Sequence, residues 1–136
     1  MGRRRFGSKG FGSKSRRAEA ADKQKLGQRA EAIVASLLEA RGYAIVARNA
    51  RVGRLEIDIV ARRGRLAIFC EVRARARSGG FSPLETIDAA KIARIRRAAA
   101  IWMGEHGWPG VHARFDAAAV TFDTPEGDVD YLEDAF

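Results

Sequence analysis

Two neighbouring apolar segments that carry acidic residues limit the possible folds of this chain more than any other feature. They read RLEIDIVAR (54–62) and RLAIFCEVRAR (65–75), and both have the alternation and the β-branched content of strands. The short turn between them, RRG, predicts an antiparallel hairpin. Three acids, Glu56, Asp58 and Glu71, fall inside these strands. Because a buried carboxylate destabilises a fold unless it is paired, hydrogen-bonded or bound to a metal, the hairpin needs a specific reason to keep them.

The rest of the sequence predicts an α/β fold in which helices flank a central mixed sheet. The expected elements are a helix over 26–42, a strand over 43–51, the hairpin, a helix over 83–103 and a strand over 113–122. Ser82 has the features of a helix N-cap, with Pro83 at the first helical position and Glu85 three residues after the cap. The final GDVDYLEDAF is either a short edge strand or an acidic tail.

The distribution of charge divides the chain into a tail and one domain. Residues 1–22 form a basic Gly/Ser/Lys/Arg-rich segment with the repeat FGSKGFGSKS, for which we expect a disordered tail, followed by a single domain over 23–136. Residues 1–25 carry nine Lys/Arg against two Asp/Glu, and residues 26–122 sixteen against nine. A basic body with a basic tail favours an anionic partner, with nucleic acid first, although a solubilising charge excess has the same composition.

Several classes of protein are disfavoured by the residues that the chain lacks. No apolar run is long enough to span a bilayer, and the basic start is not followed by the apolar segment of a secretory signal. The single cysteine, Cys70, rules out an intramolecular disulfide and favours a reducing, cytoplasmic setting. With only two histidines beside that cysteine, a zinc cage is disfavoured. A metal site would use oxygen ligands, which favours Mg²⁺ or Mn²⁺.

Strand alternation predicts that the acids of the hairpin converge. Glu56 and Asp58 share one face of their strand, and Glu71 shares a face of the next strand with Arg73, Arg75 and Arg77. A tight hairpin turns these faces to the same side, where two carboxylates repel each other unless a cation lies between them. A divalent ion would relieve the repulsion and activate water, and the arginines would hold a phosphate backbone. The alternative is that the three acids face solvent and pair with Arg54, Arg73 and Arg75.

The order of these motifs resembles a known family. The pattern E-x-D, about a dozen residues, then E-x-basic is similar to the PD-(D/E)xK nuclease superfamily. The stretch from LGQRAEAIVASLLEARGY through EVRARA to RFDAAAV resembles more closely the bacterial YraN family of endonuclease-like proteins related to Holliday-junction resolvases. The resemblance covers about residues 26–122 and leaves out the basic tail. It implies a restriction-endonuclease-like αβββαβ core.

The resemblance also implies roles for single residues. Asp58 and Glu71 match the two metal-binding acids of the superfamily motif, and Glu31 matches an acid on the first helix that supports the metal site in related resolvases. Arg73 stands where the superfamily has lysine. Arginine keeps its charge and its donors, so it could stabilise a developing oxyanion, but it does not deprotonate and cannot act as a base.

Lys91 is a candidate for the missing lysine. It is the only lysine after Lys25, and the helical spacing puts it in the middle of an apolar stripe. A lysine on a core face needs a partner, which would be Asp58 and Glu71 if this helix covers the acidic face of the sheet. An ion pair with Asp88, one turn away, is the alternative that we favour from the sequence.

Other residues have weaker signals. Arg75 and Arg77, with Arg3, Arg4 and Arg5 of the tail, are candidates for contact with a nucleic-acid backbone. Asp116 in RFD is expected to form a structural salt bridge, and Trp102 to pack in the core. Trp108 and Phe81 are candidates for base stacking, and SGGFSP (78–83) is either a DNA-contacting loop or a plain connector.

These observations predict a metal-dependent nuclease of branched DNA, such as a Holliday junction, with Glu31, Asp58, Glu71, Arg73 and Lys91 in catalysis and Asp58, Glu71 and Glu31 on the metal. A homodimer is the expected assembly, since a four-way junction presents two equivalent strands. A DNA- or RNA-binding module without cleavage activity is the first alternative, because of Arg73. A protein-interaction adaptor, using the acidic end and the basic tail, is the second.

Overall fold

A computed structural model describes the backbone of residues 3–79 and 87–136, and the side chains from Arg16 onward within those ranges. The elements in chain order are α1 (Arg3–Ala40), β1 (Ala44–Val52), β2 (Leu55–Arg63), β3 (Leu66–Arg75), α2 (Ala89–Glu105), β4 (His112–Thr121) and β5 (Asp128–Leu132). The strands form one sheet in the order β1-β2-β3-β4-β5. Only β3 and β4 pair in parallel, so the α/β fold with a mixed sheet that the sequence predicts is confirmed.

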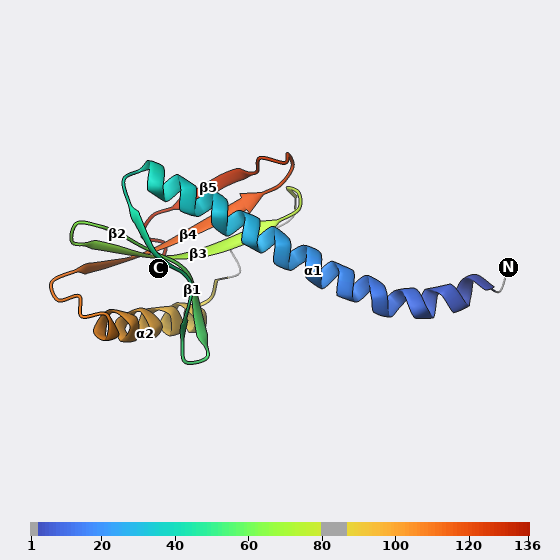
Figure 1. Cartoon of the computed structure of the whole chain (residues 1–136), viewed down its shortest axis with the longest axis horizontal. Helices are drawn as coiled ribbons and strands as arrows, with labels where there is room; N and C mark the ends of the chain where they lie inside the picture. The colour runs from blue at the N-terminus through green and yellow to red at the C-terminus, as the bar shows by residue number, and fades with distance from the viewer. Residues whose placement is uncertain (1–2, 80–86) are drawn as a thin grey trace.

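The sheet has a hydrophobic core on each face. On one face, Val34 and Leu38 of α1 pack with alternate residues of the sheet such as Ile59. On the other, Ile95 and Trp102 of α2 pack with the intervening residues, including Phe69. Figure 1 shows the two helices on opposite sides of the sheet. This arrangement follows from strand alternation, because the nearly continuous apolar run of β3 supplies both faces at once.

The first helix begins within the segment over residues 1–22, for which a disordered tail stays a prediction. Its backbone is assigned as helix from Arg3 (Figure 1), and its side chains from Arg16 to Lys25 are exposed. The expectation of disorder depended on the glycines and serines, which disfavour a helix interior. In the structure this segment continues the helix that Ala30, Val34 and Leu38 fix to the sheet.

The second helix begins later than the residue pattern predicts. Ile87 and Asp88 are not helical, so a start at Pro83 is wrong. Asp88 is the N-cap, and its Oδ1 accepts a hydrogen bond from the Lys91 backbone N–H at 2.8 Å. The motif SGGFSP and the stacking candidate Phe81 lie mostly or wholly outside the described residues. Trp102 is only 4% exposed, so its expected packing role is confirmed.

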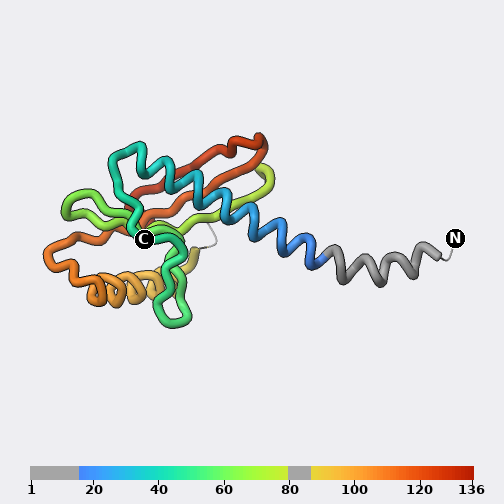
Figure 2. The backbone as a smooth tube through the Cα atoms, viewed as in Figure 1, coloured from blue at the N-terminus to red at the C-terminus, as the bar shows by residue number. Residues whose placement is uncertain are grey.

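The chain's last segment is held against β4. The GDVDYLEDAF segment contains β5, which pairs with β4 at the edge of the sheet, so the edge-strand alternative is correct. Ala135 then donates its backbone N–H to the Phe115 carbonyl at 2.7 Å, and Arg96 of α2 donates to the Phe136 carbonyl. Figure 2 shows the C-terminus back beside the sheet.

Candidate functional site

The ladder between β2 and β3 ends at the two predicted metal-binding acids. Ile59 opposite Cys70 is the last pair of this ladder, so Asp58 and Glu71 would form the next one. Instead of a backbone pair, the Asp58 carboxylate accepts a hydrogen bond from the Val72 N–H at 2.8 Å through Oδ2. The two strands therefore separate where the acids lie, and this separation opens space beside both carboxylates.

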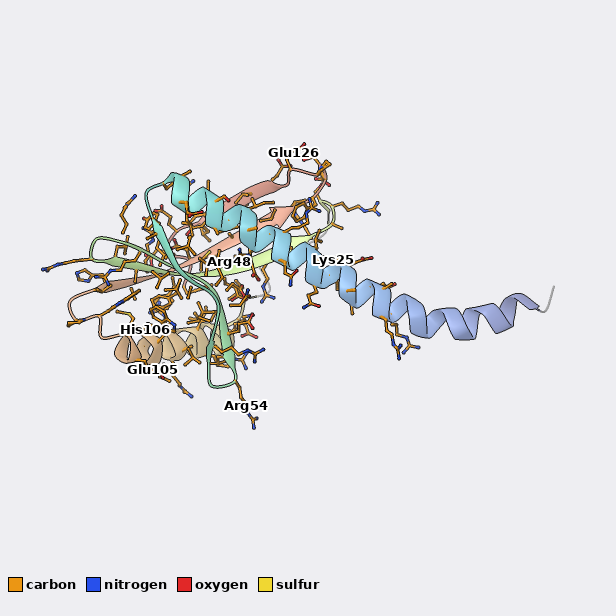
Figure 3. The ribbon with its side chains drawn as sticks, viewed as in Figure 1. Lys25, Arg48, Arg54, Glu105, His106 and Glu126 are labelled. Atoms are coloured by element: carbon orange, nitrogen blue, oxygen red, sulfur yellow. The ribbon has the colours of Figure 1, made fainter. Side chains whose placement is uncertain are left out.

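That space is a cleft of about 300 Å³, which we call the acidic cleft. Its walls come from β2, β3 and α2 and consist of Arg54, Leu55, Glu56, Asp58, Glu71, Lys91, Arg94, Ile95 and Ala98. Strand alternation thus brings the three acids of the hairpin to one cavity, as the sequence predicts. Arg54 belongs to the tip of the β1–β2 hairpin, where it extends away from the domain (Figure 3).

Burial and mutual repulsion act on the carboxylates of the acidic cleft. Burial, reinforced by the negative charge of Glu71, raises the pKa of Asp58 from 3.8 to about 7, although the Val72 N–H opposes the shift. Glu71 is 7% exposed and has two cationic neighbours: Lys91 Nζ lies 2.7 Å from Oε1, and Arg73 lies 3.6 Å from the same oxygen. Glu71 is thus compensated by protein cations, whereas the charged form of Asp58 is disfavoured.

This electrostatic situation predicts that the metal-free protein loses stability as the pH rises. Because the pKa of Asp58 is higher in the folded state than the ordinary 3.8, folding takes up a proton between about pH 4 and pH 7, and stability decreases across that range. Asp58→Asn keeps an acceptor for Val72 and should be more stable than wild type by about 2 kcal/mol above pH 7. Urea unfolding in EDTA at about pH 5 and pH 8 measures the effect.

Glu56→Gln is the control for that experiment, because Glu56 lines the same cleft from an exposed position. It should keep the pH dependence of the wild type. If the free energy of unfolding of Asp58→Asn still decreases with pH as much as that of the wild type, another group is responsible for the pH dependence.

The arrangement fits an ion that has oxygen ligands. Within the described residues, the bonds to protein groups involve Asp58 Oδ2 and Glu71 Oε1, which leaves one oxygen of each carboxylate available. Mg²⁺ commonly binds through one or two carboxylates and fills its other positions with water and phosphate oxygens. Two convergent acids, one of them poorly stabilised as an anion, meet that description. A bound cation would also remove the repulsion that disfavours the charged form of Asp58.

Glu31 lies in a neighbouring cavity rather than with these two acids. This amide pocket, of about 330 Å³, is lined by Gln24, Gly27, Gln28, Glu31, Asn49 and Glu56. Within the part of the chain that the structure describes, no three His, Cys, Asp or Glu side chains are close enough to bind one ion. Glu31 is therefore positioned to influence a metal at Asp58 and Glu71 through its charge, which reaches both acids.

The carboxylate of Glu31 is held by a residue that the sequence did not single out. Burial raises the pKa of Glu31, and a hydrogen bond with Asn49 opposes the rise. Glu31 Oε1 is buried and has no partner among the described residues. Asn49 has a φ of 52° inside β1, a left-handed conformation that few residues adopt in a strand. The one sequence feature that could have pointed to Asn49 is its residue type, because Asn tolerates a positive φ better than most residues do.

Of the arginines that are candidates for contact with a nucleic-acid backbone, Arg75 lines a third cavity, together with Arg73. A groove of about 570 Å³ runs between α1 and β3 and is lined by Lys23, Leu26, Gly27, Val72, Arg73, Ala74, Arg75 and Ala76; we call it the α1–β3 groove. Arg75 is also bonded to Thr121 and to the Gly79 carbonyl, and Arg77 is exposed after β3. Arg3, Arg4 and Arg5 belong to α1, but their side chains are outside those described.

Lys91 has a different partner from the one that we favoured from the sequence. The favoured ion pair with Asp88 is wrong: Asp88 binds the backbone N–H of Lys91, while the ammonium group of Lys91 reaches Glu71. The solvent-facing alternative for the acids holds only in part, since Glu56 pairs loosely with Arg51 at 3.9 Å and Glu71 is buried. Glu71 is buried because α2 covers the face of the sheet on which the acidic cleft lies. Figure 1 shows α2 on this side of the sheet.

Asp116 forms the structural salt bridge that the sequence predicts. Its carboxylate is fully buried and accepts two hydrogen bonds from Arg114, each 2.9 Å long. The Tyr131 hydroxyl and the Asp134 backbone N–H also donate to it. These contacts connect β4 to β5 and to the chain end, so the residue stabilises the domain and lies outside the acidic cleft.

Comparisons with known proteins give one consistent family. Residues 30–120 match the family described as "Uncharacterised protein family UPF0102". A UPF0102 protein of Sorangium cellulosum is 47% identical, over 88% of this chain and 86% of that protein. One from Leifsonia xyli is 45% identical over 74% and 85%, and one from Moorella thermoacetica is 40% identical over 84% and 97%. Among the described residues, no helix has the length and apolar character needed to cross a membrane.

Proposed function

The chain belongs to the uncharacterised protein family UPF0102, and we propose that it is a divalent-metal-dependent nuclease acting on branched DNA, such as a Holliday junction. The observation that carries the proposal is the acidic cleft, where Asp58 and Glu71 converge beside Lys91 at the point where two strands separate. Carboxylate pairs with adjacent cations are suited to metal-assisted cleavage of phosphodiesters. The family name itself assigns no activity.

The protein side chains would divide the work as follows. Asp58 and Glu71 would hold Mg²⁺ or Mn²⁺, and such an ion would supply polarisation of the phosphodiester and activation of a water molecule. Lys91, whose ammonium group contacts Glu71, would orient the water or a phosphate oxygen. Arg73, 3.6 Å from Glu71, stabilises the negative charge that develops on the phosphate. Glu31 adjusts the charge of the site from the amide pocket.

The sequence motif supports the same interpretation. The spacing of Asp58, Glu71 and Arg73 resembles the PD-(D/E)xK superfamily, with arginine in the place of lysine, and the wider pattern resembles the YraN family. The observed helix–three strands–helix–strand order agrees with the restriction-endonuclease-like core that this resemblance implies. Lys91 enters the cleft from α2. It supplies the flexible ammonium group that β3 lacks, because Arg73 stands where the superfamily motif has lysine.

One observation favours the alternative, a nucleic-acid-binding module without cleavage activity. Both Lys91 and Arg73 contact Glu71, and two cations on one carboxylate compete with a metal ion. In that case the cationic side chains would hold phosphate while the acids only orient them. Such a module would bind nucleic acid in a salt-sensitive way and without any need for a divalent ion.

The experiment that separates these functions is incubation of a labelled four-way DNA junction with the full chain in Mg²⁺, in Mn²⁺ and in EDTA. The nuclease proposal expects strand scission near the branch point that requires the divalent ion. Junction binding that is equal in EDTA, with intact strands under all three conditions, would support the binding module instead.

Lys91→Met tests the role of the lysine. It keeps the length and most of the apolar stem of the side chain but removes the ammonium group, and we expect cleavage to slow by about 100-fold, the size of a single lost orienting or acid–base contact. Junction affinity should change little. Arg94→Met is the matched control, because Arg94 lines the same cleft one turn later on α2. If the cleavage rate falls equally in the two variants, Lys91 acts only as one of several positive charges near the phosphate.

A further inference from the structure

Three cavities among the described residues form a row that ends at the acidic cleft. The α1–β3 groove and the amide pocket share Gly27, and the amide pocket and the acidic cleft share Glu56. Each shared residue lines two cavities, so the row leads from Lys23 on the α1 side of the sheet to Lys91 on the α2 side, past the point where the β2–β3 ladder ends. Figure 1 shows α1 crossing the sheet beside β3, which forms the outer part of this path.

The character of the lining changes along the row. In the α1–β3 groove, an apolar floor that includes Leu26 and Val72 lies beside the cations Lys23 and Arg73. This combination suits a sugar–phosphate backbone, whose sugars contact apolar surface while its phosphates contact cations. Arg73 also lies 3.6 Å from Glu71, so the cationic groove reaches the acids themselves.

The amide pocket between the two ends is suited to a base. Gln24, Gln28 and Asn49 each carry both hydrogen-bond donors and an acceptor. Such amides can bond the edge that a paired adenine shows in the major groove, but they can also bond the Watson–Crick edge of a nucleobase, which is free only when the base is unpaired.

The three cavities are too small to enclose a base-paired duplex. The three cavities measure about 300, 330 and 570 Å³. These volumes are typical of sites for small molecules, at about 300–1,000 Å³, and are too small for a double helix whose major groove alone is about 12 Å wide. A single nucleotide in each cavity is compatible with them.

We propose that this row binds one unpaired strand of nucleic acid, such as a flap or an opened junction arm. Lys23 and Arg73 hold its backbone, the amides take one base, and the following phosphodiester lies at Asp58 and Glu71. Only this last step rests on the proposed nuclease function. The exposed Arg16, Arg17 and Lys25 of α1 remain available to the paired part of the same substrate.

Gly27 offers a direct test, because it lies where the groove meets the amide pocket. A Cβ built there meets nothing within 4 Å, and Gly27 is in the interior of a helix, so Gly27→Leu should preserve the fold and favour the helix. Its side chain would stand in the passage between the two cavities. Gly104→Leu is the matched control, since Gly104 is also helical and open, at a separate cavity near the end of α2.

The measurement is fluorescence anisotropy of a labelled oligothymidylate and of a blunt duplex of the same length, at one fixed salt concentration. We expect Gly27→Leu to bind the single strand at least about tenfold more weakly, the effect of losing one or two stacked or paired nucleotides, with unchanged duplex binding. Gly104→Leu should match the wild type with both probes. Unchanged single-strand binding by Gly27→Leu, or equal losses with both probes, would overturn the proposal.

A second pair of variants avoids any change in packing. Lys23→Glu reverses a charge in the groove, while Lys25→Glu makes the same change on an exposed neighbour that does not line it; Figure 3 labels Lys25 on α1. We expect single-strand affinity to fall several-fold more for Lys23→Glu, because it loses a phosphate contact as well as net charge. Equal losses for the two variants would also overturn the proposal.

Mn²⁺ uptake by Gly27→Leu distinguishes failure of this proposal from failure of the nuclease proposal. The variant should bind Mn²⁺ as the wild type does, because Gly27 does not line the acidic cleft. If the wild type itself takes up no Mn²⁺, the nuclease proposal fails, and the anisotropy results alone decide whether the row binds an unpaired strand.

Discussion

Asp58→Asn and Glu71→Gln should each reduce Mg²⁺-dependent cleavage of a branched DNA by about 1,000-fold or more, because each removes half of the charge that holds the ion and activates the water. Both substitutions keep the size of the side chain, and Asn keeps an acceptor for the Val72 N–H. Junction affinity in EDTA should be unchanged or slightly higher, since a negative charge near the phosphate is lost. Gel assays of cleavage and anisotropy measurements of binding check the two halves of this result.

Glu56→Gln is the control for these variants. Glu56 lines the acidic cleft but is exposed and has only a loose contact with Arg51, so its loss should change cleavage much less. Activity that survives in Asp58→Asn and Glu71→Gln would place the reaction at another site or in a contaminating enzyme. Loss of binding together with cleavage would show that the acids support the fold rather than the chemistry.

Asp116→Ala should lower the free energy of unfolding by about 3–5 kcal/mol, the cost of removing one partner of a buried ion pair. The substitution removes a fully buried carboxylate, so the Tyr131 hydroxyl loses its acceptor and the Arg114 guanidinium loses both of its 2.9 Å hydrogen bonds. The largest part of this cost comes from Arg114, whose charge keeps only the 3.6 Å contact with the exposed Glu133 as an ion pair. Urea unfolding followed by circular dichroism measures the change.

Two further variants make the interpretation specific. Asp116→Asn keeps an acceptor and the volume and should lose less than Asp116→Ala. Glu133→Ala removes an exposed partner of Arg114 at 3.6 Å and should change stability by no more than about 0.5 kcal/mol. If the free energy of unfolding of Asp116→Ala lies within about 1 kcal/mol of the wild-type value, the buried network contributes little to the stability of the domain.

The strands and the convergence of the acids could be predicted because they depend on short-range patterns. Alternation with a period of two places Asp58 and Glu71 on the same side of a hairpin once the turn between the strands is recognised. The same rule pairs Arg114 with Asp116 two residues later on β4. Each of these inferences needs only a few neighbouring residues.

The partner of Lys91 and the start of α2 could not be predicted in the same way. Ser82 and Asp88 are both good N-cap residues, and the sequence does not rank them, although only a start after Asp88 matches the structure. Whether Lys91 meets Asp88 or Glu71 depends on which face of the sheet α2 covers, and that is decided by packing between distant segments. Asn49 was missed for a similar reason, because its contact with Glu31 joins β1 to α1.

The way in which α1 packs on the sheet could not be predicted from composition. The cavities between α1, β1 and β3 depend on how the helix crosses the sheet, which no local pattern specifies. The sequence therefore predicts the pair of acids, Asp58 and Glu71. The contact of Lys91 with Glu71, the amide pocket and the α1–β3 groove are seen only in the folded structure.

Isothermal titration of Mn²⁺ into the metal-free chain at about pH 8, where Asp58 is ionised, is the most direct test of the central claim, that Asp58 and Glu71 share one cation. We predict uptake of one ion per chain, and Asp58→Asn and Glu71→Gln should each abolish it, whereas Glu56→Gln should retain it. Undiminished Mn²⁺ uptake by Asp58→Asn and Glu71→Gln, or no uptake by the wild type, would contradict the claim.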